Sequence, residues 1–507
     1  MERQIIMNAG KLLRRISQVV FLVAFIGLLA TSGAPQGIPL PRDIFVRIDP
    51  LAGLTTALAF SDYAQIGSRL FQFLPAVGLL VLTALFGRFF CGWMCPLGTC
   101  IDIFHAVAIV PFKKKDAKIA RWPQLKYYLL ALVIGAAVLG AQLVWVLDPI
   151  PLLTRAVATG IWPLIQRAFN RLIELRPVSG FTPLIVHQYQ WGTVALVGFA
   201  VILALSVISR RYWCRNLCPL GALLAFVGRY GLWRRRVSGA CIQCGQCPDR
   251  CPMGAIPEDD PARTKTPECI LCYDCADCPA GAISISVTTG DSADASIDIG
   301  RRRFLAVMIG GFLYGLLGRR VVFRAQGRRA LIRPPGAHVK APDGRFVRMM
   351  SEAEFRAQCL RCGECMHACP TKVIQPAGWE GGLDAFFTPV MDASAGYCES
   401  NCTICGDVCP SGALRPFGVE DKSDIKIAVA IIDRDVCLSW GRGEQYVECL
   451  TCVMRCPYSA IAPERIDGQL RPVIQPDRCV GCGTCEFHCP AAPHAAIRIY
   501  RRNDMND

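Results

Sequence analysis

The chain has 507 residues, of which 52% are hydrophobic and only 19% charged, and its mean hydropathy is +0.34. This length exceeds that of a single domain, and the hydropathy indicates that part of the chain lies in lipid. The net charge of +15 is concentrated in residues 1–318, which hold 31 Lys and Arg against 18 Asp and Glu. Anionic lipid and membrane topology explain this excess better than nucleic acid does, so we expect no nucleic-acid partner.

Four hydrophobic runs, at about 17–32, 70–90, 127–147 and 190–209, are each near the ~20 residues that a spanning helix needs. Lys and Arg cluster before the first run, after the second and after the fourth. The positive-inside rule therefore places the N-terminus, the loop at 91–126 and the stretch after 210 in the cytoplasm. We expect a multi-pass protein of the bacterial inner membrane, in which residues 1–233 form a four-helix α-helical domain.

Two local sequences within this domain echo each other: R-F-F-C-G-W-M-C-P-L-G from Arg88 and R-Y-W-C-R-N-L-C-P-L-G from Arg211. The echo indicates an internal duplication of a two-helix unit. Its four cysteines can hold a further cluster or a soft metal such as copper, or form disulfides that relay electrons: Cys91, Cys95, Cys214 and Cys218. Alternatively, Pro96 and Pro219 simply end helices with reduced, buried thiols behind them. Cys100, the fifth cysteine of this region, fits a structural role.

Asp148 begins an Asp-Pro-Ile-Pro sequence at the outer end of the third hydrophobic run. An ionisable group near the membrane surface can accept a proton from a quinol, which makes Asp148 a candidate catalytic residue. Capping of a helix end is the commoner use of such an aspartate, and the sequence leaves both roles open.

Residues 234–300 form the first of three two-cluster units, because they contain two sets of four cysteines, each ending in Cys-Pro. The spacing C-x2-C-x2-C-x3-C-P is that of bacterial ferredoxins, in which the fourth cysteine binds the neighbouring cluster. The crossed pattern assigns one 4Fe–4S cluster to Cys241, Cys244, Cys247 and Cys278, and another to Cys269, Cys272, Cys275 and Cys251. Zinc ribbons do not use three cysteines spaced in this way, so zinc is disfavoured.

A fifth apolar run, Phe304 to Leu317, follows Arg301, Arg302 and Arg303. This pattern is typical of a twin-arginine export signal, so residues 301–320 are predicted to be a transmembrane anchor. Residues 321–345, which are rich in Pro and Arg, would be a linker, and residues 321–507 would then be periplasmic. Because the run is short, it can instead be a buried or surface helix, which would leave all the clusters in the cytoplasm.

Two more ferredoxin units follow, at residues 346–420 and 421–507. The same crossed pattern assigns their four clusters to Cys359, Cys362, Cys365 and Cys409; to Cys398, Cys402, Cys405 and Cys369; to Cys437, Cys449, Cys452 and Cys489; and to Cys479, Cys482, Cys485 and Cys456. Cys437 lies twelve positions before Cys449, so the insert between them, including Trp440, must loop out as a surface insertion or a partner-docking lobe.

Glycines recur within these cysteine sets, and we expect them to let backbone N–H groups turn toward cluster sulfurs. They are Gly245, Gly363, Gly406, Gly481 and Gly483. The chain is therefore predicted to be multi-domain, with an α-helical membrane domain followed by three α+β ferredoxin units.

Residues 1 to about 290 resemble NapH, the membrane ferredoxin-type subunit that accompanies periplasmic nitrate reductases. The resemblance rests on the four hydrophobic runs, the two C-x3-C-P motifs that begin at Cys91 and Cys214, and the two-cluster unit that follows. Residues from about 299 onward resemble NapG, its four-cluster periplasmic partner, also called the MauM type, through Arg302-Arg303-Phe304-Leu305 and four cysteine sets. The chain thus resembles a fusion of two subunits.

The resemblance implies a quinol dehydrogenase module that takes electrons from menaquinol or ubiquinol and passes them to a periplasmic redox enzyme or cytochrome, as part of a larger complex. Two other functions remain open. One is a metal-reducing or maturation ferredoxin for a reductase, and the other is a non-catalytic electron-relay subunit with quinone bound elsewhere. The residues do not determine the direction of electron flow.

Overall fold

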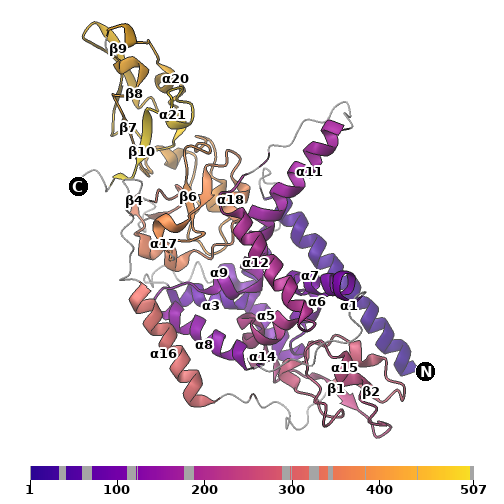
Figure 1. Ribbon diagram of the computed structural model, residues 1–507. Coiled ribbons are helices and arrows are strands. Elements are labelled where there is room, and N and C mark those ends of the chain that lie inside the picture. The colour runs from indigo at the N-terminus through magenta and orange to yellow at the C-terminus, as the bar shows by residue number, and fades with distance from the viewer. Residues whose placement is uncertain are drawn as a thin grey trace. The chain divides into compact units, whose positions relative to one another are not determined.

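A computed structural model describes residues 2–32, 41–59, 71–110, 122, 124–175, 186, 188–287, 297, 300–318, 331–340, 346–382, 384–441 and 443–502. The chain divides into two compact units, whose elements are labelled in Figure 1. Unit 1 comprises residues 1–31, 42–156 and 194–317, and unit 2 comprises residues 32–41, 157–193 and 318–507. Both units therefore combine segments that lie far apart in the sequence.

Unit 1 is mainly helical, and its longest helix is α1, Glu2–Ala30. Its other principal helices are α2 (Ile44–Arg47), α3 (Pro50–Ala59), α5 (Leu74–Phe86), α7 (Pro96–Phe104), α8 (Leu125–Val138), α9 (Val144–Leu147), α10 (Pro149–Ala156), α12 (Gly192–Ala204), α14 (Pro219–Gly228) and α16 (Arg301–Gly318). Helices α3, α5, α8 and α14 pack against one another. A proline stands in the first turn of α5, α7 and α14, where the missing N–H would be unpaired in any case.

Among the described residues, one helix has the length and apolar composition of a membrane span, and it is Met7–Ala30 within α1. The runs expected at about 70–90, 127–147 and 190–209 form shorter apolar helices, Phe71–Phe86, Leu125–Val138 and Gly192–Val207. These fall below the ~20 residues that cross a hydrocarbon core without help from neighbouring segments. The four spans therefore stay a prediction.

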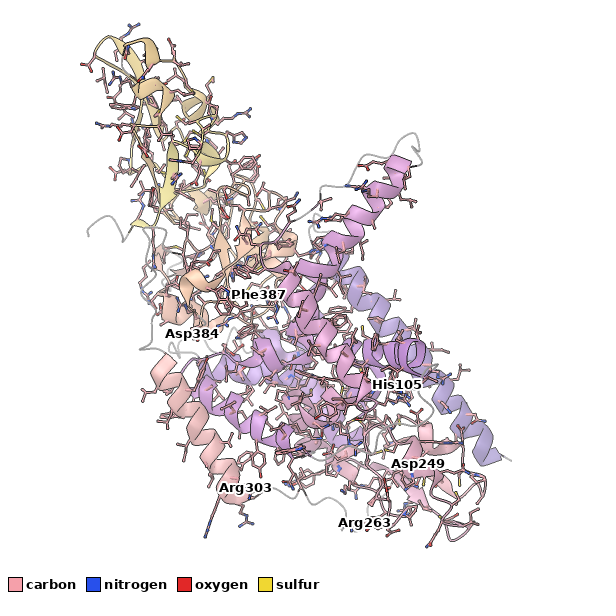
Figure 2. All side chains as sticks on the ribbon, viewed as in Figure 1. His105, Asp249, Arg263, Arg303, Asp384 and Phe387 are labelled. Carbon is pink, nitrogen blue, oxygen red and sulfur yellow. The ribbon has the colours of Figure 1, made fainter. Side chains whose placement is uncertain are left out.

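The expected fifth apolar run is helical and forms most of α16, with Arg303 near its N-terminal end (Figure 2). Glycines bring α16 and α8 into close contact. A Cβ at Gly311 would lie 3.0 Å from the carbonyl carbon of Leu132, and a Cβ at Gly135 would lie 3.1 Å from that of Met308. The spacing Gly311-x3-Gly315 on this face is typical of membrane helices whose backbones approach closely.

The ferredoxin domain of unit 1 is closed by a two-stranded antiparallel sheet. Strand β1 (Trp233–Val237) pairs with β2 (Ile283–Val287), so the two ends of the domain lie side by side. The short helix α15 (Gln246–Arg250) and the turns that carry the cysteines lie between these strands in the sequence.

Unit 2 contains the other two ferredoxin units, built from short strands and helices. Its antiparallel pairs are β3–β4 (His338–Lys340, Phe346–Met349), β5–β6 (Ile374–Pro376, Pro389–Met391), β7–β10 (Val429–Ile432, Ile497–Tyr500) and β8–β9 (Ile461–Ile466, Gln469–Ile474). Its helices are α11 (Trp162–Leu175), α17 (Glu352–Gln358), α18 (Glu364–Ala368), α19 (Ile404–Asp407), α20 (Thr451–Arg455) and α21 (Thr484–Phe487). As in unit 1, β7 and β10 bracket one ferredoxin unit.

Residues 157–193, which the sequence assigns to the membrane domain, form part of unit 2. The Tyr189 hydroxyl donates to Met366 O at 2.9 Å, and the rings of Trp162 and His367 stand 5.5 Å apart. Lys372 Nζ donates to Val186 O at 2.7 Å. This segment therefore packs on the ferredoxin unit at 346–420.

Candidate iron–sulfur centres

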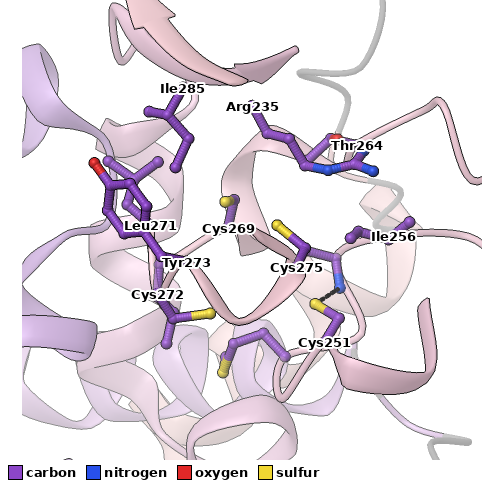
Figure 3. A pocket seen from close by; sticks show the side chains of 13 residues that line it. Arg235, Cys251, Ile256, Thr264, Cys269, Leu271, Cys272, Tyr273, Cys275 and Ile285 are labelled. Carbon is purple, nitrogen blue, oxygen red and sulfur yellow. Dashed lines mark hydrogen bonds between the residues drawn. The ribbon is translucent and has the colours of Figure 1, made fainter. Parts of the chain in front are cut away.

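The first two cysteine sets line neighbouring pockets in the ferredoxin domain of unit 1. One pocket, shown in Figure 3, is lined by Cys251, Cys269, Cys272 and Cys275. The other is lined by Cys241, Cys244, Cys247 and Cys278, with Cys275 at its edge. Each pocket thus brings together the four cysteines that the crossed pattern assigns to one cluster. Arg235 of β1 lines both pockets, and its Nη2 donates to Cys247 Sγ at 3.4 Å.

The four sets of unit 2 group in the same crossed way. A third pocket is lined by Cys437, Cys449, Cys452 and Cys489. Mutual electrostatic interactions group Cys409 with Cys359, Cys362 and Cys365. In the same manner they group Cys369 with Cys398, Cys402 and Cys405, and Cys456 with Cys479, Cys482 and Cys485.

Backbone N–H groups point at the sulfur of the Cys-Pro cysteine in four of the sets. Ala255 N donates to Cys251 Sγ at 3.3 Å, as Figure 3 shows. The equivalent bonds run from Leu414 to Cys409, from Ala460 to Cys456 and from Ala496 to Cys489, at 3.2 to 3.3 Å. Such bonds stabilise a thiolate and tune a cluster's potential. The four sets that have such a donor are therefore suited to bind 4Fe–4S clusters.

The glycines of these sets serve two different purposes. Gly363 and Gly481 have φ of 86° and 79°, which side chains rarely adopt, so they allow the turn that the sequence predicts. Gly406 differs, because it lies in α19 without a positive φ, and a Cβ there would meet the backbone of Arg415 and Pro416. Its role is close packing.

The cysteine sets of unit 2 follow one another in a line whose order differs from that of the sequence. We name each set by its first cysteine in the chain. Helix α18, which carries Cys365, packs on α19, which carries Cys405, and this contact links the Cys359 set to the Cys398 set. Cys398 N donates to Cys482 O at 2.8 Å. Helix α20, which carries Cys452, packs on α21, which carries Cys485. The line therefore runs through the Cys359, Cys398, Cys479 and Cys437 sets.

The insert between Cys437 and Cys449 folds back onto its own unit. The Ser439 hydroxyl donates to Cys449 O at 2.7 Å, and Cys449 N donates to Ser439 Oγ at 2.8 Å. The Trp440 ring lies beneath the guanidinium groups of Arg434 and Arg471, at 4.1 and 5.0 Å. Arg471 belongs to β9, so the insert is packed on the β8–β9 hairpin.

A buried lysine, Lys422, stands beside the Cys398 set of unit 2. Lys422 Nζ donates to Cys402 O at 2.7 Å and to Glu399 O, and interacts with the thiol of Cys398. A cation in this position stabilises a reduced cluster.

Helix α17 leads into the Cys359 set and begins with a capping box, in which Ser351 and Glu354 exchange hydrogen bonds. A hydrogen bond from Arg348 is the main cause that lowers the pKa of Glu354 to about 2, and the Ser351 N–H adds to it. This cap fixes the start of the helix that ends at Cys359.

The two C-x3-C-P motifs come together in unit 1. Cys91 and Cys95 flank the turn between α6 (Phe90–Trp93) and α7, and Cys214 and Cys218 flank the turn between α13 (Tyr212–Asn216) and α14. The four thiols, which we call the C-x3-C-P quartet, are all buried and interact electrostatically with one another. Cys100, in α7, is partly exposed.

From the sequence, some of the charged residues around the quartet indicate only membrane topology, and the others carry no prediction. Arg14 and Arg211, two of the positive charges that suggested a cytoplasmic side, both bind Asp102 at 2.8 Å. Arg88 pairs with Glu268 at 3.1 Å, and both arginines that precede the C-x3-C-P motifs are fully buried. The sequence feature that could have indicated these buried ion pairs is the arginine with which both echoed sequences begin.

Asp148 is fully buried, and its Oδ1 accepts the Ile150 N–H at 3.2 Å, which caps α10. Asp49 caps α3 in the same way, accepting the Leu51 N–H at 2.9 Å, and the Oδ2 atoms of both carboxyl groups are buried. The capping role of Asp148 is thus visible in the structure, while proton exchange with a quinol stays a prediction.

Two family models match parts of the chain, the first over both C-x3-C-P motifs and the second over the last ferredoxin unit. A family described as a 4Fe-4S binding domain matches residues 69–115 and 191–240, and a 4Fe-4S dicluster domain matches residues 447–492. No solved structure shows a significant match.

Three curated relatives can be compared with the chain. The methylamine utilization ferredoxin-type protein MauM of Methylophilus methylotrophus is 33% identical over 196 residues, which cover 37% of this chain and 78% of the relative. The ferredoxin-type protein NapG of Escherichia coli is 34% identical over 217 residues, covering 39% and 84%. The putative electron transport protein YccM of Escherichia coli is 28% identical over 241 residues, covering 46% and 60%. The chain is therefore an iron–sulfur electron-transfer protein that belongs to the MauM and NapG family of ferredoxin-type proteins.

Proposed function

We propose that this protein is a membrane-bound subunit that oxidises menaquinol or ubiquinol and passes the electrons to a periplasmic redox enzyme or cytochrome. When bound, 4Fe–4S clusters accept and release single electrons. The observation that carries the proposal is the continuous line of four ligand sets in unit 2, from the Cys359 set to the Cys437 set. An ordered series of ligand sets is suited to transfer electrons from a partner at one end to a partner at the other.

The six sets would hold six 4Fe–4S clusters, two in unit 1 and four in unit 2. Within unit 1, the Cys241 and Cys269 sets share Cys275 and Arg235 between their pockets. In the Cys437 set, two hydrogen bonds between Ser439 and Cys449 hold the insert against the cysteines. Ser439 and Arg235 contribute fixed positions and, in the case of Arg235, a fixed charge.

A membrane location is supported by large apolar side chains that several helices of unit 1 expose. They include Leu12, Ile16, Val19 and Val23 of α1; Val77, Val81 and Leu85 of α5; Val194, Val197 and Val201 of α12; and Leu305, Ile309 and Leu313 of α16. Soluble proteins rarely expose contiguous apolar surface on this scale, whereas lipid-facing helices do so as a rule. The shorter helices can contribute to the membrane domain by pairing with neighbours.

Two sets of contacts support the expected sidedness. In unit 1, the ferredoxin domain is tied to the helix ends predicted to be cytoplasmic, through Arg14, Arg88 and Lys126, which bind Asp274 and Glu268. In unit 2, Val186 and Tyr189, which belong to the loop at 148–189 between the third and fourth hydrophobic runs, bind the ferredoxin unit at 346–420; that loop would be outside if the predicted topology holds. Residues 234–300 would then be cytoplasmic and residues 321–507 periplasmic.

The NapH-like assignment of residues 1 to about 290 is supported by the match of a 4Fe-4S binding domain to both C-x3-C-P repeats. Asp148, whose carboxyl group lies near that of Asp49, is our candidate proton acceptor for quinol oxidation. Asp148 is fully buried, so in this structure its side chain has no exposed surface for a quinol to contact. That burial favours the second candidate function, a relay subunit of a larger complex whose quinone binds on another chain.

The test is anaerobic reduction of the purified full-length chain in detergent by a short-chain quinol, followed by visible bleaching and by electron paramagnetic resonance. Quinol dehydrogenase activity predicts bleaching by the quinol and no change with the oxidised quinone. Reduction by dithionite without any reduction by the quinol would overturn the quinol proposal and leave the relay function. A reporter fused after Asp507 and read inside the cytoplasm would overturn the periplasmic placement.

A further inference from the structure

The C-x3-C-P quartet is assembled by two copies of one local structure. In each copy a short helix carries the first cysteine, the second cysteine ends the turn, and a proline opens the next helix. Cys95 interacts with Cys91 and Cys214, and Cys218 interacts with Cys214 and Cys91. Four thiols from segments over a hundred residues apart thus converge on one buried place in unit 1.

An arginine of each copy reaches into the other copy. Arg88 Nη2 donates to Cys214 O at 3.1 Å, and Arg211 Nη1 donates to Cys91 O at 2.6 Å. The glycine of each Cys-Pro-Leu-Gly leaves room for this crossing. A Cβ at Gly98 would lie 3.3 Å from Arg211 Nη2, and a Cβ at Gly221 would lie 3.2 Å from Arg88 Cζ. The repeated residues other than cysteine therefore hold the two halves of the quartet together.

The charge around the quartet is suited to an anionic centre. The ion-pair network there contains five cations and three anions, an excess of two positive charges: Arg14, Arg88, Lys126, Arg210 and Arg211 against Asp102, Glu268 and Asp274. The guanidinium group of Arg88 is electrostatically coupled to the thiol of Cys91, while its buried Nε has no hydrogen-bond partner among the described residues. These cations act on the quartet and on Cys272 of the adjoining Cys269 set, and the carboxyl group of Asp148 lies near Cys218. A 4Fe–4S core with four thiolates carries about two negative charges in its oxidised form, which suits these positive surroundings.

The quartet adjoins the Cys269 set directly. Trp93 Nε1 donates to Leu271 O at 3.1 Å, and Arg14 Nη1 donates to Cys272 O at 3.1 Å. A Cβ at Gly92 would lie 2.5 Å from Ile270 O. The turn that contains Cys91 and Cys95 therefore rests on the loop that carries Cys269 and Cys272.

We propose that Cys91, Cys95, Cys214 and Cys218 ligate a seventh iron–sulfur cluster, which continues the ligand sets of unit 1 toward the apolar helices. Binding replaces the thiolates of a cluster-carrier protein by these four, each of which releases its thiol proton. The proposal concerns ligation alone, so it stands whether or not the protein oxidises quinol.

The test uses the full-length chain purified anaerobically in detergent, with iron and acid-labile sulfide determined per chain. The double variant Cys91→Ser/Cys214→Ser should lose about four irons and four sulfides, together with one component of the redox-titrated paramagnetic spectrum. Cys100→Ser, a change in α7 outside the quartet, is the matched control and should lose neither. Unchanged iron and sulfide in the double variant would overturn the proposal.

A second measurement guards against a double variant that fails to fold. Iron and acid-labile sulfide in the wild-type chain should each come to about 28 per chain if the quartet is loaded, against about 24 if only the six ferredoxin sets are loaded. A wild-type content of about 24, or Cys–Cys disulfides among the quartet found by mass spectrometry, would overturn the proposal. Loss of all iron from the double variant with about 28 irons in the wild type would still support it.

Discussion

Packing of α16 on α8 through glycine makes a sharp prediction, because the chain offers matched positions on one helix. A Cβ at Gly311 would lie 3.1 Å from Ala136 N and closer still to Leu132 O, both backbone atoms that cannot rotate away. At Gly315 the nearest atom would be Leu139 Cβ at 2.8 Å, and at Gly310 nothing would lie within 4 Å. Alanine substitution at these three glycines should therefore have graded effects.

The magnitudes follow from overpacking and helix propensity. Forcing an extra methyl group into close contact costs about 1–3 kcal/mol, and replacing glycine by alanine in a helix returns about 0.5–1 kcal/mol. Gly311→Ala should thus destabilise the folded chain by about 0.5–2 kcal/mol, while Gly310→Ala should be neutral or stabilising. Gly315→Ala should fall between them, because its closest approach, 2.8 Å to Leu139 Cβ, is less severe than the approach of Gly311 to Leu132 O.

The assay is thermal denaturation of the purified chain in detergent, followed as the fraction that remains monodisperse on size exclusion. A destabilisation of this size lowers the midpoint by about 1–8 °C, and Gly310→Ala in the same preparation is the control. Equal midpoints for Gly311→Ala and Gly310→Ala would refute the packing of α16 on α8. A larger effect at Gly310 would show that another face of α16 makes the contact.

Three further predictions concern the ferredoxin units. Lys422→Met should lower the reduction potential of the cluster in the Cys398 set by tens of mV, since it removes a buried cation, and redox-titrated spectra should show the other clusters unmoved. Cys409→Ser should alter the cluster of the Cys359 set and spare that of the Cys398 set; the reverse spectral change would contradict crossed ligation. Glu354→Gln should cost about 1 kcal/mol of stability, equally at pH 8 and pH 6, because a pKa lowered to about 2 keeps the contribution complete above the ordinary value near 4.5. That contribution is lost only as the pH falls from about 4.5 toward 2. A difference in thermal midpoint between the wild type and Glu354→Gln that changes from pH 8 to pH 6 would therefore contradict the capping role.

The grouping of cysteines within the ferredoxin units is a local property that the sequence by itself determined, and their ligation of clusters stays a prediction. The spacing C-x2-C-x2-C-x3-C-P sets which three cysteines share a turn and which one reaches the neighbour, because a few residues of backbone cannot do otherwise. The structure places the same residues together, with Cys251 beside Cys269 and Cys437 beside Cys489.

Everything that depends on contacts between distant segments was decided only by the tertiary structure. Spacing cannot reveal that Cys398 meets Cys482, which sets the order of the line, because the two belong to different ferredoxin units. Nor can it show that residues 157–193 join unit 2, or that Arg88 and Arg211 cross between the two repeats. From the sequence, Arg211 indicates only membrane topology, and Arg88 carries no predicted contact. Their burial depends on Glu268 and Asp102, partners more than a hundred residues away, and no local pattern encodes such a pairing.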